Sequence, residues 1–309
     1  MDCLTESIRR TALEAGADLV GFAPISRFDQ APAPLHPRTV FPPVRTVIAI
    51  ALRQPRGALK AVEEGAYWQA YNCDSYWYLN EVLAPQVLRG IVMALEEEGY
   101  TSVPVHNPFH SHSGRRVRED QPHGPDGMVS LRVIGCAAGL GELGLSKLLL
   151  TPQFGPRQRV FAVFTDAELE PTPLLERSVC DECGACAREC EACAIGRSRD
   201  ECFTIEGRTF GHASFDAGAC AKVHQGMDPR FSPFWNGSEP QGGEPSYNKF
   251  CKDRFRHLAV CVGRGCIRAC LDHLEKTGRI EAKFRNPFIE RPRWKLNEPP
   301  EKKKDGNNS

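Results

Sequence analysis

The sequence predicts an α+β fold in two domains, followed by a charged tail. Up to residue 172, apolar runs with helical spacing alternate with short β-branched runs. Prolines at 171 and 173 then mark a boundary, and most of the 14 cysteines follow it. A chain of 309 residues has room for two domains. We therefore expect an α/β domain at 1–172, a cysteine-rich domain at 173–289 and a disordered tail at 290–309.

The first domain is predicted to contain helices that alternate with buried strands. An amphipathic helix should cover residues 4–16 and stop at Gly16. The run VRTVIAIAL at 44–52 is uninterrupted and β-branched, which is typical of a strand buried on both faces. A longer helix fits between 67 and 100. The other expected elements are strands at 18–23, 102–105 and 159–165 and a helix-like segment at 130–138.

Residues 106–127 are rich in histidine, proline, glycine and charge, which predicts a long loop. Loops of this length in compact domains are usually lids or binding loops, or are disordered. His106, His110 and His112 could titrate near neutral pH or bind a metal ion, although most loop histidines do neither.

The segment Gly139-Leu-Gly141-Glu-Leu-Gly144 matches the dinucleotide fingerprint G-x-G-x-x-G, with Asp166 where the ribose-binding acid would stand. That motif needs a strand before the glycines and a full helix after them. Prolines at 152 and 156 leave room for barely two helical turns, and residues 130–138 favour a helix. We therefore reject a dinucleotide site.

Composition excludes several classes of partner. Lys+Arg and Asp+Glu are both 39, so the formal net charge is zero, which argues against a dedicated nucleic-acid or anionic-membrane surface. There is no apolar run of membrane-spanning length. Arg9-Arg10 resembles a twin-arginine export signal, but acidic residues follow where a hydrophobic region is required. We expect a cytoplasmic protein with no membrane partner.

The second domain is organised by two cysteine runs, Cys180-x2-Cys183-x2-Cys186-x3-Cys190 and Cys261-x4-Cys266-x3-Cys270. The first run is the thiolate pattern of bacterial ferredoxins, in which three sulfurs bind one cluster and the fourth binds its neighbour. Such a run requires a partner run, which the second supplies. Disulfides favour small secreted domains, and zinc sites usually come as two separated C-x2-C pairs. The runs predict iron–sulfur clusters, with a zinc-stapled protein as the minor alternative.

Residues 136–166 resemble a block that two related families carry just ahead of their cysteine ladder. Its parts are Cys136-Ala-Ala-Gly139-Leu-Gly141-Glu-Leu-Gly144, Leu149-Leu-Thr-Pro-Gln-Phe-Gly155-Pro-Arg157-Gln-Arg159 and Phe164-Thr-Asp166. The families are the epoxyqueuosine reductases and the corrinoid-dependent reductive dehalogenases, and the resemblance covers about Asp18 to Cys270. It implies a divergent member with a nitroreductase-like, cobalamin-binding-type domain. A ferredoxin-like domain with two [4Fe-4S] clusters would follow and supply electrons.

The resemblance also implies site residues. The first cluster would be held by Cys180, Cys183, Cys186 and Cys270, and the second by Cys190, Cys261, Cys266 and Cys220. Cys220 is preferred because Asp216–Cys220 is similar to the family segment that carries this ligand. Cys202 is its rival, and Cys193 is the rival of Cys190. The glycines expected to bind cofactor are Gly139, Gly141 and Gly144.

The chain departs from the family pattern at several positions. Glu191 stands where a proline is usual, and four residues separate Cys261 from Cys266 where two are usual. We expect Gly263 and Gly265 to let this longer loop fold back through positive φ. Only 39 residues (309 − 270) follow the last cysteine, whereas epoxyqueuosine reductases carry a helical tRNA-binding domain there. A small-molecule substrate is therefore expected in place of tRNA.

The implied activity is a reductase in which the clusters pass electrons to a corrinoid that reduces a small organic substrate. Its electron donor would be a ferredoxin or flavodoxin. The proton donor would be Asp126, near the family's aspartate, or a tyrosine with a basic neighbour, as in dehalogenases. Tyr71, Tyr76 and Tyr78 are candidates for that tyrosine. The alternative is a cobalamin-free electron-transfer protein that serves a partner enzyme.

Overall fold

The computed structural model describes residues 3–106, 117–119, 128–234, 259–289 and 294–296. The candidate proton donor Asp126, the histidines His110 and His112, and most of the expected tail lie outside these ranges. Within the ranges, every helix is too short or too polar to cross a bilayer.

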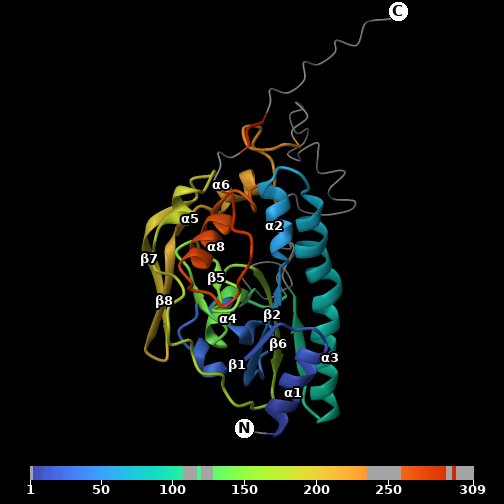
Figure 1. Ribbon diagram of the computed structural model, residues 1–309. Coiled ribbons are helices and arrows are strands. Elements are labelled where there is room, and N and C mark those ends of the chain that lie inside the picture. Colours follow the sequence, from blue (N-terminus) through green and yellow to red (C-terminus); the bar gives the residue numbers. More distant parts are fainter. Residues whose placement is uncertain (1–2, 107–116, 120–127, 235–258, 290–293, 297–309) are drawn as a thin grey trace, which may run out of the picture.

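A four-stranded antiparallel sheet forms the centre of the N-terminal part of the chain (Figure 1). Its strands, in spatial order, are β1 (Leu19–Pro24), β2 (Thr46–Arg53), β6 (Gln158–Thr165) and β3 (Ser102–Val105). The register places Ile50 of β2 between Val20 of β1 and Phe161 of β6. All four strands lie where the sequence predicted them. The mixture of helices with an antiparallel sheet confirms the α+β class.

Helices cover both faces of this sheet, which explains why β2 is apolar from Val47 to Leu52. Helices α1 (Cys3–Glu14) and α3 (Ala84–Glu97) pack on one face, where Leu88 meets Ile48 in a buried cluster. Helix α4 (Leu131–Ala137) packs on the other face through Ile134. Each such fully buried apolar side chain contributes about 1.5–3 kcal/mol. The short 3₁₀ turns η1 (Ile25–Phe28), η2 (Ala33–Leu35) and η3 (Pro37–Thr39) connect β1 to β2.

The long helix expected between 67 and 100 is divided into two kinds of helix. Residues Tyr71–Leu83 form a π-helical segment, η4, and α3 continues from Ala84. The spacing of apolar residues along the chain does not distinguish the i→i+5 hydrogen bonds of a π-helix from the i→i+4 bonds of an α-helix. π-Helical geometry is rare and often occurs at functional sites. Here it turns Tyr71 and Tyr76 inward, with 3% and 9% of their surface exposed, and leaves Tyr78 44% exposed.

A short hairpin follows α4 where a dinucleotide-binding protein would have a helix. Its strands are β4 (Glu142–Leu143) and β5 (Leu149–Leu150). The glycine-rich segment before it therefore lacks the helix N-terminus that would bind a pyrophosphate. This arrangement agrees with the rejection of a dinucleotide site.

The cysteine-rich part contains more structure than the sequence predicted. Its elements are α5 (Ala185–Arg188), the antiparallel hairpin of β7 (Ile195–Ile205) and β8 (Arg208–Phe215), α6 (Ala217–His224) and α8 (Cys266–Lys276). Only the end of α8, at 271–276, was expected. The helix begins five residues earlier and so carries two cysteines. The hairpin lies along one side of the molecule in Figure 1.

The cysteine-rich part packs against the N-terminal part through α2 (Arg56–Glu63) and α8. Leu59 and Val62 of α2 share a buried cluster with Leu271 and Leu274 of α8. A β-carbon on Gly263 would collide with the backbone carbonyl oxygen of Leu59.

Gly263 is therefore required for close packing. Neither Gly263 nor Gly265 is among the glycines with positive φ. The expectation that positive φ at these glycines lets the longer loop fold back was wrong. Trp294, inside the expected disordered tail, is also packed. Its Nε1 donates to the carbonyl oxygen of Val62 at 3.1 Å.

Candidate functional site

The first group of cysteines surrounds a small cavity. Cys180, Cys183 and Cys186 reach it from the loop before α5 and from α5 itself, and Cys270 reaches it from α8. These are the four residues that the sequence analysis assigned to one cluster. The structure thus brings together two segments that lie more than eighty residues apart in the chain.

A buried carboxylate fixes the start of this loop. Oε1 of Glu142 accepts hydrogen bonds from the backbone N–H groups of Val179 and Cys180, both at 2.6 Å, and from Ser178 Oγ at 2.7 Å. On the opposite side, Arg279 donates to the carbonyl oxygen of Val179 at 2.8 Å. Sequence reasoning missed Glu142, although it belongs to the glycine-rich block. Its position just ahead of the ladder was the available signal.

The expected cofactor-binding glycines lie against other parts of the protein. A β-carbon on Gly139 would meet the carbonyl oxygen of Pro173, and one on Gly141 would meet that of Leu150. Gly144 faces the Leu150 side chain and also lines the first cysteine cavity. Gly139 and Gly141 therefore permit close backbone packing that places Glu142, while Gly144 borders a candidate cofactor site.

The second group of cysteines borders a larger cavity of about 370 Å³. Cys220 of α6, Cys261 and Cys266 line it. Cys190 lies close enough for its thiolate charge to raise the pKa of each of these three thiols.

The rival cysteines lie elsewhere. Cys193 and Cys202 are exposed, and neither is among the thiolates that raise the pKa values of Cys220, Cys261 and Cys266, whereas Cys190 acts on all three. Cys202 lies on β7, paired across the hairpin with Gly211. The geometry therefore favours Cys190 and Cys220 as members of the second group.

The two groups adjoin through one turn of helix. Cys266 and Cys270 are four residues apart on α8, which corresponds to a rise of about 6 Å. Cys266 belongs to the second group and Cys270 to the first. Cys186 and Cys190 are also four residues apart, and Cys186 belongs to the first group and Cys190 to the second. The two groups are therefore neighbours in space.

Burial makes these thiols difficult to ionise without a cation. It raises the pKa of Cys186 to about 11 and that of Cys266 to about 12, with neighbouring thiolates adding to the effect. The pKa values of Cys261 and Cys270 are raised well above their ordinary value for the same reasons. Thiolates crowded in this way are stabilised by a bound metal centre, so both groups fit iron–sulfur clusters.

One half-buried histidine contacts the second group. His224 Nδ1 lies 3.4 Å from Cys261 Sγ, at the end of α6. Burial, followed by the charge of Arg159, lowers its pKa to about 4, so the ring is neutral at pH 7. A neutral imidazole can donate its N–H to a thiolate, and hydrogen bonds to ligand sulfurs tune the potential of a cluster.

The cavity beside the second group contains two of the three candidate tyrosines. Tyr71 accepts a hydrogen bond from Gln54 Nε2 at 3.2 Å, and Arg159 lies 4.4 Å over the ring of Tyr76. Tyr78 does not reach the cavity. A tyrosine with a basic neighbour, as the resemblance implied for a proton donor, is thus present beside the cysteines.

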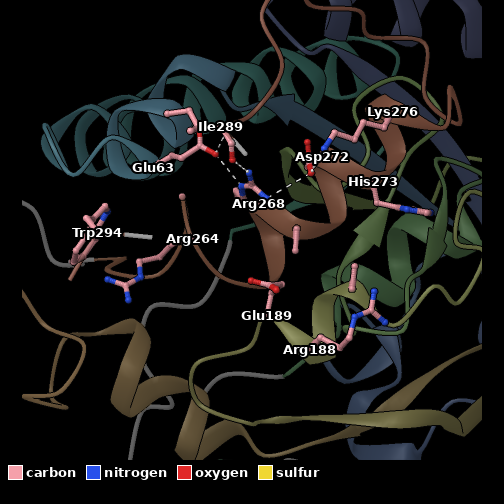
Figure 2. Close-up of a pocket in the computed structure, with 13 residues that line it drawn as sticks. Glu63, Arg188, Glu189, Arg264, Arg268, Asp272, His273, Lys276, Ile289 and Trp294 are labelled. Carbon is pink, nitrogen blue, oxygen red and sulfur yellow. Dashed lines mark hydrogen bonds and ion pairs between the residues drawn. The ribbon is translucent and has the colours of Figure 1, made fainter. Parts of the chain in front are cut away.

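A separate cavity of about 660 Å³ lies between α2, α5 and α8 (Figure 2). Its charged side chains pair with one another. Glu63 Oε1 lies 2.9 Å from Arg268 Nε, and Asp272 lies 3.5 Å from Arg268 and 3.2 Å from Lys276. None of the described residues that line it is a cysteine. The Glu63–Arg268 pair joins α2 to α8, whereas the two pairs of Asp272 lie within α8.

Curated relatives match only part of the chain. The tetrachloroethene reductive dehalogenase of Desulfitobacterium hafniense is 42% identical over 82 residues, which is 26% of this chain and 15% of that protein. The enzyme of the same name from Dehalobacter restrictus is 46% identical over 66 residues, which is 20% of this chain and 12% of that protein. This chain therefore spans a small fraction of these relatives. No family model matches it.

Solved structures share the fold over more of the chain. A catabolic reductive dehalogenase matches with a TM-score of 0.51 and 19% identity, over 71% of this chain and 29% of that one. An epoxyqueuosine reductase matches with a TM-score of 0.51 and 16% identity, over 93% of this chain and 69% of that one. Both groups of proteins are those that the sequence block resembles, so the predicted resemblance is confirmed.

Proposed function

We infer that this chain, whose fold and partial sequence matches fit a divergent member of the reductive dehalogenase and epoxyqueuosine reductase superfamily, is an iron–sulfur oxidoreductase. One observation carries the proposal. Eight cysteines form two adjoining groups of four, and the second group borders a cavity that could hold an electron acceptor. Electrons would enter at the first group and leave at the second.

Each group would hold one [4Fe-4S] cluster. The first would use Cys180, Cys183, Cys186 and Cys270, and the second would use Cys190, Cys220, Cys261 and Cys266. When bound, the clusters would supply single electrons. The protein supplies the thiolates, the clamp from Glu142 on the first loop, and the His224 hydrogen bond to Cys261.

The acceptor would be a small organic molecule in the 370 Å³ cavity. Its two-electron reduction would take one electron from each cluster and two protons, one from a tyrosine hydroxyl of the cavity and one from solvent, and solvent would then reprotonate the phenolate. The Arg159 charge beside Tyr76 favours the phenolate left after proton transfer. An external low-potential carrier of the ferredoxin or flavodoxin class would reload the clusters.

A corrinoid is the other acceptor that the resemblance implies. One reductive dehalogenase of similar fold, with a TM-score of 0.51, is described as carrying out B12-dependent dehalogenation. The cavity bounded by the described residues, however, lies at the lower end of the range for drug-sized ligands, about 300–1,000 Å³. A corrinoid is larger than such ligands. The described residues therefore fit a small substrate better than a corrinoid.

The test begins with anaerobic purification, followed by iron and zinc analysis and visible spectra before and after dithionite. We expect about eight iron atoms per chain and a colour that reduction bleaches. Cys186→Ser should lose about half of the iron, whereas the matched variant Cys193→Ser should lose almost none. A colourless, iron-free protein, or equal losses in the two variants, would refute the cluster assignment.

The small cavity also favours a second candidate, a cobalamin-free electron-transfer protein that serves a partner enzyme. Incubation of the iron-loaded protein with cobalamin, followed by desalting, separates a corrinoid reductase from this electron-transfer protein. Stoichiometric retention would support the corrinoid reductase. Loss of all cobalamin, with continued reduction of an added carrier protein, would support the electron-transfer protein.

A further inference from the structure

The cavity beside the second cysteine group has an unusual charge. Arg132 and Arg159 line it, and none of its described lining residues is an aspartate or glutamate. No ion pair joins either arginine to a carboxylate in the described part of the chain, where the charged groups acting on Arg132 are Arg159, Cys220 and Cys266. The cavity in Figure 2 differs, because there arginines and carboxylates pair directly.

The two arginines occupy different depths. Arg132, on α4, is exposed, whereas Arg159, on β6, is half-buried. Arg159 Nε donates to the carbonyl oxygen of Ser75 at 3.2 Å, which orients the guanidinium over Tyr76. A guanidinium carries five N–H donors in a planar fork that matches a carboxylate, so this contact leaves donors for a ligand.

The rest of the cavity wall is largely apolar. Its hydrophobic side chains are Leu131, Leu148, Leu149, Val160, Phe215, Val262 and Ile267. Such a wall excludes water from the body of a ligand, which strengthens any charged hydrogen bond made beside it. The arrangement thus combines an apolar pocket with two cations.

We propose that this cavity binds a small organic anion, with its carboxylate or similar group between Arg132 and Arg159 and its apolar body against the leucine-rich wall. The inference deepens the proposed function, because it names the substrate class of the same cavity. Two like charges that face one pocket repel each other, and an anion relieves that repulsion. The competing explanation is that the arginines offset only the charge of the neighbouring cluster.

The experiment measures binding to the iron-loaded protein by anaerobic titration calorimetry. Benzoate is the anionic probe, and benzamide is its neutral counterpart of nearly equal size. We expect benzoate to bind at least about tenfold more tightly, because it alone forms charge-assisted hydrogen bonds with the arginines. Benzoate should also change the electron paramagnetic resonance signal of one reduced cluster and leave the other unchanged.

Substitutions then locate the site. Arg132→Gln and Arg159→Gln should each weaken benzoate binding at least about tenfold and leave benzamide binding unchanged. Arg197→Gln, on the exposed side of β7, is the matched control and should change neither. Arg132 is exposed, so its variant keeps the test valid if Arg159→Gln does not fold.

Three outcomes would overturn the proposal. They are benzoate binding no tighter than benzamide, full benzoate affinity in both arginine variants, and loss of iron from the variants in proportion to their loss of binding. The last result would assign the arginines to the cluster. Iron content is measured on every sample, so an iron-free protein that still prefers benzoate would refute the proposed function and leave this inference standing.

Discussion

At the scale of single residues, two departures from the family pattern pair with each other. Glu191 replaces the usual proline after the first cysteine run, and Arg264 lies in the lengthened second run. Their side chains form an ion pair in which Glu191 is 3% and Arg264 11% exposed. Arg264 also lies 3.9 Å over the ring of Trp294. The pair joins the two cysteine runs where both clusters would be held.

Breaking this ion pair should be costly. Arg264→Met leaves the Glu191 carboxylate buried without its cation, so we expect the free energy of unfolding to fall by about 3 kcal/mol. Urea denaturation of the anaerobically purified protein measures the change. Arg45→Met is the control, because Arg45 pairs with Glu168 on the surface, and it should cost less than about 1 kcal/mol. Equal effects of the two substitutions would contradict a structural role for the pair.

At the scale of elements, α8 connects the two cysteine groups to the N-terminal part. It carries Cys266 and Cys270, and its apolar face packs with α2. Across the same contact, the guanidinium of Arg56 binds both carboxylate oxygens of Glu275 at 2.7 Å. The close approach of the chain before α8 to α2 depends on Gly263, which has no side chain to displace the α2 backbone.

Adding one methyl group at Gly263 tests whether the close approach of this segment to α2 stabilises the fold. Gly263→Ala places a β-carbon against the backbone of Leu59 and Glu63, which cannot rotate away as a side chain can. We expect a loss of about 1–3 kcal/mol in unfolding free energy. Gly57→Ala, on α2 with nothing near its added methyl, should instead be neutral or stabilising by up to about 1 kcal/mol. A neutral Gly263→Ala variant would show that the two segments can separate.

At the scale of the whole molecule, two of the cavities have opposite character. The cavity of about 660 Å³ is lined by charged side chains, among them the Glu63–Arg268 pair that joins α2 to α8. The smaller cavity brings together cysteines, tyrosines, a histidine and two arginines from segments spread over most of the chain. The side chains that line the smaller cavity, and not its volume, make it the candidate site.

The metal-free molecule should depend on pH through its buried thiols. Cys186 and Cys266 have pKa values of about 11 and 12 when folded, against an ordinary value of 9.0. The folded state therefore holds protons that the unfolded state releases above about pH 9. Stability from these thiols is complete below pH 9 and is lost as the pH rises toward 12. Denaturation of the apoprotein between pH 8 and 11 should show this loss.

The iron-loaded protein is the comparison, since its ligand thiolates have no proton to lose. Its stability should fall less over the same pH range. In the metal-free protein, Cys186→Ala should reduce the slope of stability against pH by removing one raised thiol. An unchanged slope would show that Cys186 does not titrate as its burial implies.

The local sequence determined where the strands of the sheet lie and how the cysteines of the first run are spaced. The β-branched run at 44–52 specifies a buried strand because only apolar side chains can face helices on both sides. The spacing within the first cysteine run likewise limits what those thiols can bind. The hairpin β7–β8 was missed because its exposed strand lacks a clear alternation of apolar and polar residues.

Tertiary structure decided what the cysteines and arginines meet. Spacing along the chain does not say whether Cys220 or Cys202 lies beside Cys261, since that depends on how α6 and the hairpin pack. Nor does it place Arg132 and Arg159 in one cavity, or match Glu191 with Arg264. Local sequence carries the chemistry of each side chain and the local backbone preference. Contacts between distant segments exist only after apolar surfaces have been buried against each other.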